Sequence, residues 1–195
     1  IEDAENILIT SSVDYCITLN KKSGIFQIYN YTDISLIFED TIESVFNSAK
    51  FRDSSEKVNS KNIVGIAFST YLFVLVETSF YEYDLLCLSI EKKTITFQFK
   101  QHLKLSNAPN FIFPGKGAVY LQCGDLLLKC RVPNFEKNKK IQNLSYPLSR
   151  VISPSENEGN FVITSSADIG YVIKSDMKCI TILNYPIKHG TSVTF

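Results

Sequence analysis

The chain has 195 residues, 45% of them hydrophobic, so it can bury a substantial core and is globular. Its 20 Lys and Arg balance 20 Asp and Glu, which excludes a bulk electrostatic attraction to nucleic acid or an anionic membrane. No apolar run reaches the roughly 18 residues that a spanning helix needs. Fourteen Phe and ten Tyr among many Ile, Val and Thr favour pleated strands and predict an all-β protein.

The N-terminus predicts no signal peptide, because Asp3 and Glu5 stand where a basic segment should be. The chain starts at Ile1 and has a single Met, so we expect it to be a piece of a longer protein. Its five cysteines are odd in number and scattered among apolar residues. This pattern favours reduced core thiols in an intracellular protein, nuclear or cytoplasmic, over a disulfide framework. They are Cys16, Cys87, Cys123, Cys130 and Cys179.

The first predicted unit is a hairpin. Residues 15–19 and 25–29 are β-rich runs, and the Lys-Lys-Ser-Gly sequence at 21–24 joins them. Gly24 supplies the positive φ that the reversal needs. We therefore expect two antiparallel strands here.

A helical pattern follows the hairpin, because five apolar residues recur at a spacing that places them on one helix face. They are Phe38, Ile42, Val45, Phe46 and Ala49. Asp40 with Glu43 resembles an acidic capping box, so we predict a helix near residues 41–51 and a polar linker over 52–61. Residues 40–61 would form an insertion between blades, with Phe38, Ile42 and Phe46 as candidate partner contacts.

The second unit contains four expected strands, at residues 63–68, 71–76, 83–90 and 94–99. In the last run, polar Thr94, Thr96 and Gln98 alternate with Ile95, Phe97 and Phe99, so one face should be wet and the other buried.

The third unit comprises residues 110–113, 118–121 and 126–130, with a Pro-Gly-Lys-Gly turn at 114–117. That turn lacks the spacing of a phosphate-binding loop and precedes a strand. A lysine-rich segment follows, with Lys137, Lys139 and Lys140. We interpret it as a solvated loop, and a nucleic-acid contact is the alternative.

The fourth unit has strands at residues 149–153, 161–164, 171–174 and 179–183. Its Ile-Thr-Ser-Ser-Ala-Asp sequence at 163–168 repeats Ile-Thr-Ser-Ser-Val-Asp at 9–14, at an offset of 163 − 9 = 154 residues. This offset corresponds to about four repeats of about 38 to 45 residues each.

Four short strands separated by polar turns, with the Ile-Thr-Ser-Ser-x-Asp turn, resemble a WD-repeat-type propeller blade. The family's Gly-His and Trp-Asp signatures are absent, and propellers with degenerate signatures, such as those of nucleoporins and other large-complex subunits, look more similar. The resemblance implies a single propeller-like domain over residues 1–195, with four to five blades that form part of a larger ring and one short inserted helix. A β-sandwich is the competing fold.

The chemistry of the chain points away from catalysis. Its two histidines, His102 and His189, are 87 positions apart, and no zinc-binding spacing is present. We therefore expect no enzyme, no cofactor and no metal site.

Our leading hypothesis is a non-catalytic scaffold subunit of a multi-protein complex. Open blade edges would be covered by other protein subunits, because unpaired strand edges are sticky. The alternatives are a nucleic-acid-associated subunit that uses the lysine-rich loop and a β-sandwich adhesion or binding module.

Overall fold

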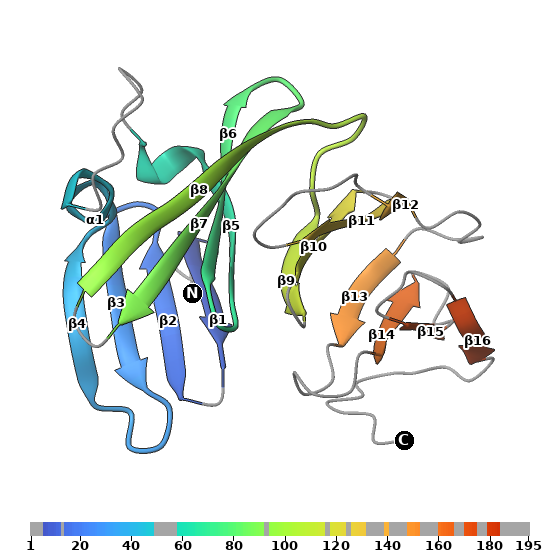
Figure 1. Cartoon of the computed structure of the whole chain (residues 1–195), viewed down its shortest axis with the longest axis horizontal. Helices are drawn as coiled ribbons and strands as arrows, with labels where there is room; N and C mark the ends of the chain where they lie inside the picture. Colours follow the sequence, from blue (N-terminus) through green and yellow to red (C-terminus); the bar gives the residue numbers. More distant parts are fainter. Residues whose placement is uncertain are drawn as a thin grey trace. The chain divides into compact units, whose positions relative to one another are not determined.

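The chain forms two compact units, Ile1–Leu105 and Ser106–Phe195. The computed structural model in Figure 1 describes residues 6–12, 14–48, 58–91, 94–115, 118–123, 126–131, 139–140, 148–152, 160–165, 170–174 and 179–183. Sixteen strands in these residues form four sheets of four strands each, which confirms the all-β prediction.

The first sheet is an antiparallel meander in the order β1-β2-β3-β4. Its strands are β1 (Ile7–Ser11), β2 (Tyr15–Asn20), β3 (Ile25–Asn30) and β4 (Leu36–Thr41). The predicted hairpin is β2 and β3, and Gly24 has the expected positive φ, at 73°. A Cβ on Gly24 would lie 3.2 Å from Glu43 Oε2, so lack of space and backbone conformation both favour glycine there.

The predicted short helix is present as α1 (Ile42–Ser48), between the first and second sheets. The expected capping by Asp40 and Glu43 is wrong, because Thr41 caps the helix: its Oγ1 accepts the N–H of Ser44 at 3.3 Å. Asp40 instead accepts the Ser44 hydroxyl at 2.8 Å. Residues 49–57, which include the predicted end of the helix and most of the linker, lie outside the described residues.

The second sheet has the order β5-β6-β7-β8. A short 3-10 helix, η2 (Ser60–Asn62), precedes it, and its strands are β5 (Ile63–Phe68), β6 (Leu72–Ser79), β7 (Glu82–Glu91) and β8 (Thr94–Lys104). The alternation predicted for residues 94–99 is confirmed, since the threonines and Gln98 are exposed and the residues between them are buried or half-buried. β8 extends five residues beyond the predicted end, to Lys104, so His102 lies within a strand.

The core of the first unit lies between its two sheets, and α1 contributes to it. The first strands of the two sheets are linked directly, because Thr10 Oγ1 accepts the backbone N–H of Phe68 at 2.9 Å. The core residues come from both sheets and from the helix, and include Ile17, Leu19, Phe26, Ile28, Ile42, Val45, Phe46, Leu72, Val74, Leu86 and Leu88. The two sheets and α1 therefore share one apolar core.

The second unit contains two further meanders, β12-β11-β10-β9 and β13-β14-β15-β16. The first is built from β9 (Phe111–Gly115), β10 (Ala118–Cys123), β11 (Leu126–Arg131) and β12 (Lys139–Lys140). The second comprises β13 (Leu148–Ile152), β14 (Asn160–Ser165), β15 (Gly170–Lys174) and β16 (Cys179–Leu183). In the third sheet, the Phe113 and Tyr120 rings stack with centroids 5.2 Å apart.

Each sheet uses four consecutive strands, so the β-sandwich alternative, in which two sheets face each other through Greek-key connections, is wrong.

The two copies of the repeated Ile-Thr-Ser-Ser-x-Asp sequence do not lie at equivalent positions of their sheets. The first copy begins in β1, the first strand of the first sheet, whereas the second copy begins in β14, the second strand of the fourth sheet. The offset of 154 residues is therefore not a whole number of blades, and the first and fourth sheets are three sheets apart, not four.

Candidate interaction surface

One face of the first sheet is open. Strand alternation sends Leu8, Ile17 and Phe26 into the core, so their sequence neighbours face the opposite side. The strand register pairs Cys16 with Tyr29, and Tyr29 with Leu36. We call this surface the open face and define its apolar residues as Ile7, Ile9, Cys16, Ile25, Tyr29 and Leu36.

The open face exposes large apolar side chains. Ile9 is 65% exposed and Leu36 51%, and Ile7 and Ile25 are also exposed. The second sheet differs, because Leu72 and Val74 on one of its faces and Phe73 and Leu75 on the other are all buried. Among the described strand residues of the first unit, the exposed large apolar side chains all belong to the first sheet.

The middle of the open face is polar and internally hydrogen-bonded. Thr18 Oγ1 donates to Gln27 Oε1 at 3.2 Å, and Gln27 Nε2 donates to Glu39 Oε2 at 2.6 Å. Since these groups satisfy one another, the row can be covered by another surface without leaving several polar groups unpaired. The open face therefore combines a hydrogen-bonded polar row with apolar residues around it.

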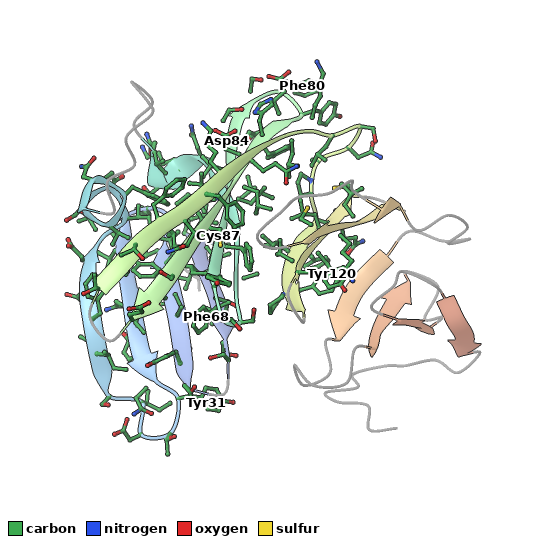
Figure 2. The ribbon with its side chains drawn as sticks, viewed as in Figure 1. Tyr31, Phe68, Phe80, Asp84, Cys87 and Tyr120 are labelled. Carbon is green, nitrogen blue, oxygen red and sulfur yellow. The ribbon has the colours of Figure 1, made fainter. Side chains whose placement is uncertain are left out.

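The β3–β4 hairpin extends this surface with an ordered, exposed tip. Tyr31 and Ile34 are both exposed, and Figure 2 shows Tyr31 at one end of the first unit. Ile34 has φ 57°, a left-handed conformation that is costly for a β-branched residue. Hydrogen bonds from Ile34 N to Asn30 O and from Asn30 N to Ser35 O, both 2.9 Å, hold the turn in place.

Replacing Ile34 by asparagine should raise the free energy of unfolding by about 1 kcal/mol, because Asn tolerates the left-handed region better. Chemical denaturation of both proteins measures the difference. Ile9→Asn is the matched control: Ile9 is equally exposed, at 65%, but lies in a strand, so no strain is relieved. A destabilised Ile34→Asn variant would contradict the strain.

The predicted partner contacts on the helix are not on the surface. Ile42 and Phe46 are buried in the core, and Phe38 packs against it, with its ring centroid 6.3 Å from that of Phe26. The side chains of Ile42 and Phe46 are therefore not available to a partner in this structure, whereas Phe38 is half-buried and its contact stays a prediction.

The predicted basic cluster is described only in part. Lys139 and Lys140 form β12 and pair with Lys129 and Leu128, so part of the predicted solvated loop is the fourth strand of a sheet. Lys137 and the side chains of Lys139 and Lys140 lie outside the described residues. The nucleic-acid contact stays a prediction.

A buried carboxylate that the sequence analysis missed lies on β7. Asp84 is 6% exposed; its Oδ2 is 2.7 Å from Lys100 Nζ, and its Oδ1 is 3.0 Å from His102 Nδ1. The register pairs Asp84 directly with His102, so the cluster links β7 to β8. Its sequence signal is a charged residue inside the otherwise apolar run at residues 83–88. We interpret it as structural, because Lys100 forms an ion pair with the carboxylate and His102 hydrogen-bonds to it.

The buried cysteine thiols in the described parts of both units are poorly reactive. Burial raises the pKa of the Cys87 thiol to about 12 and that of Cys123 to about 11. The pKa of Cys130 rises to about 12, chiefly through burial. All three thiols are therefore protonated near neutral pH and are poor nucleophiles. Cys16 is half-buried, on the open face.

The described residues contain neither a metal-binding cluster nor a membrane-spanning helix. No three His, Cys, Asp or Glu side chains among them gather as a metal site would require. No described helix has the length and apolar character to cross a bilayer.

Comparison with solved structures supports the fold. AztD from Citrobacter koseri, in its apo form, aligns with a TM-score of 0.61 at 10% identity over 91% of this chain and 59% of that one. BamB from Moraxella catarrhalis aligns with a TM-score of 0.55 at 8% identity over 92% and 48%, respectively. KlHsv2 with loop 6CD replaced by a Gly-Ser linker aligns with a TM-score of 0.51 at 14% identity over 90% and 52%.

These structures are β-propellers, and the chain has the fold of propeller blades. It spans about half the length of the propellers that it matches. No protein-family model matches the sequence, and neither does any curated protein sequence. The similarity therefore establishes the fold class alone.

Proposed function

We propose that the chain is a non-catalytic protein-interaction scaffold and that the open face of its first sheet is the binding surface. The observation that carries this proposal is the exposure of Ile7, Ile9, Ile25 and Leu36 on one face of a sheet whose other face is a packed core. Large exposed apolar side chains that share one face of a sheet with hydrogen-bonded polar groups suit a protein-binding surface.

The fold and the polar chemistry support this function. Propeller blades present rigid faces and loops, and many propellers bind other proteins. The clustered ionisable groups, Asp84, Lys100 and His102, satisfy one another across two strands. The proposal includes a location in the nucleus or cytoplasm, which is supported by buried thiols at Cys87 and Cys123 that form no disulfide.

Photo-crosslinking in cells tests the scaffold function. A photoreactive amino acid replaces Ile9 in the full protein, and crosslinked products are identified by mass spectrometry. We expect a discrete protein adduct at this position. The control carries the same residue in place of Phe80, which is 81% exposed at the β6–β7 turn and, as Figure 2 shows, lies at the opposite end of the first unit from Tyr31. No adduct at position 9, or the same adducts at both positions, would contradict the proposal.

A further inference from the structure

One end of the open face carries acidic and apolar side chains together. Asp14 lies there just before β2, and a hydrogen bond from Tyr31 N to Asp14 O, at 2.9 Å, joins it to the β3–β4 hairpin tip. Asp33 and Ile34 belong to the same tip, and all four residues are exposed. We call Asp14, Tyr31, Asp33 and Ile34 the acidic tip.

The acidic tip is negatively charged. Asp33 Oδ1 accepts the Ser35 hydroxyl at 2.6 Å and the Ser35 N–H at 3.0 Å, and these bonds lower the pKa of the Asp33 carboxyl. Lys21 and Lys22, the lysines in the described part of the first sheet and its turns, lie at the β2–β3 turn, at the other end of the strands. No described lysine of this sheet therefore neutralises the acidic tip.

The open face itself adds to this negative charge. Among the described strand residues that strand alternation places on it, Glu39 carries the only charge. Nucleic acid or an anionic lipid surface would meet like charge along the face and at its tip. A partner that covers Tyr31 and Ile34 has to supply apolar side chains for these two residues and cationic groups for the carboxylates beside them.

The backbone of Ile34 supports a binding role for the acidic tip. Its φ of 57° is costly for a β-branched residue, yet the side chain is 65% exposed and so gains little from packing within the fold. Strain of this kind persists at functional sites, where the side chain serves a contact and not stability. Because hydrogen bonds already hold the turn, little entropy is lost when a partner covers it.

We propose that the open face binds a protein surface that is both basic and apolar. Lys or Arg side chains of the partner pair with Asp14 and Asp33, and its apolar side chains cover Tyr31 and Ile34. The proposal rests on the scaffold function argued above and specifies the partner of that surface. Exposed charge pairs mainly set the association rate and the choice of partner, and salt screens them. Binding should therefore weaken as the salt concentration rises.

Titration calorimetry of the full protein with the partner identified by crosslinking at position 9 tests this proposal. Asp14→Asn with Asp33→Asn removes both charges and keeps a side-chain carbonyl that accepts from Ser35, so the turn should be retained. We expect this variant to bind at least about threefold more weakly than the parent chain in about 50 mM salt, and the difference to vanish in about 1 M salt. Glu77→Gln with Glu91→Gln is the matched control: it removes two exposed carboxylates from the second sheet and should leave the affinity unchanged.

Ile34→Asn separates binding from stability. We expect it to raise the dissociation constant about tenfold, because it removes an apolar contact from the tip. The same substitution should raise the free energy of unfolding, because it relieves the strain at this position. A purely structural role for Ile34 would not produce these opposite changes.

Three results would overturn the choice of a basic partner. The double Asn variant could bind as tightly as the parent chain at low salt, the Gln control could lose as much affinity as the double Asn variant, or Ile34→Asn could bind like the parent. These failures are distinct from failure of the scaffold function. A partner that crosslinks at position 9 but binds all variants equally disproves only the basic partner, whereas the lack of any adduct disproves the binding function and this proposal with it.

Discussion

Replacing Phe26 by alanine should lower the free energy of unfolding of the first unit by about 3–5 kcal/mol. Phe26 is fully buried on β3, in the core shared by the two sheets and α1. Its ring also meets that of Phe38 edge-on, with an interplanar angle of 66°. The substitution leaves a cavity at the centre of this core, where neighbours from three elements can collapse only in part.

Denaturant unfolding, followed by circular dichroism, measures this effect. Phe80→Ala is the matched control, because it removes the same ring from a side chain that is 81% exposed, and it should change stability by no more than about 0.5 kcal/mol. Equal losses for the two variants would show that the Phe26 ring is not packed as the structure has it.

Strand positions were predictable where local chemistry and burial agree. Residues 15–29 combine β-branched and aromatic runs with a Ser-Gly reversal, and they form the predicted hairpin β2–β3. The helix was also predictable, because Ile42, Val45 and Phe46 recur at helical spacing and all three are buried. The cap was misassigned because Asp40, Thr41 and Glu43 are all plausible capping residues, and only the geometry shows that Thr41 accepts from Ser44.

The open face was not predictable, because the sequence does not say which side of a strand is covered. Ile7, Leu8 and Ile9 form one apolar run, which is typical of a strand buried on both faces. In the structure Leu8 packs into the core while Ile7 and Ile9 are exposed. This difference depends on the presence of a neighbouring sheet, which is a tertiary property.

The repeated Ile-Thr-Ser-Ser-x-Asp sequence indicated a wrong blade spacing for a related reason. A short polar turn such as Ile-Thr-Ser-Ser-x-Asp satisfies the local needs of any hairpin, so it can recur at non-equivalent places. Its copies begin in β1, the first strand of the first sheet, and in β14, the second strand of the fourth sheet. The number of blades was thus better indicated by counting strands than by the repeat.

Replacing Lys100 by methionine and His102 by alanine together should lower the free energy of unfolding by about 2–4 kcal/mol. The double variant removes both side-chain partners of Asp84, the Lys100 ammonium and the His102 imidazole, and Asp84 is 6% exposed and so remains largely desolvated. Part of the loss is offset because the side chains of Lys100 and His102 are themselves 33% and 54% exposed, so water can reach this end of the cluster.

Adding Asp84→Leu to that double variant should restore most of the lost stability, because it removes the buried charge whose desolvation caused the loss. Urea unfolding of the three proteins separates this cost from the loss of side-chain packing. Lys104→Met is the control: it breaks the ion pair with Glu82 at 3.3 Å, but the Lys104 side chain is 81% exposed, so stability should change by less than about 1 kcal/mol. If the triple variant were no more stable than the double variant, the buried charge would not be the source of the loss, and Asp84 would contribute through packing alone.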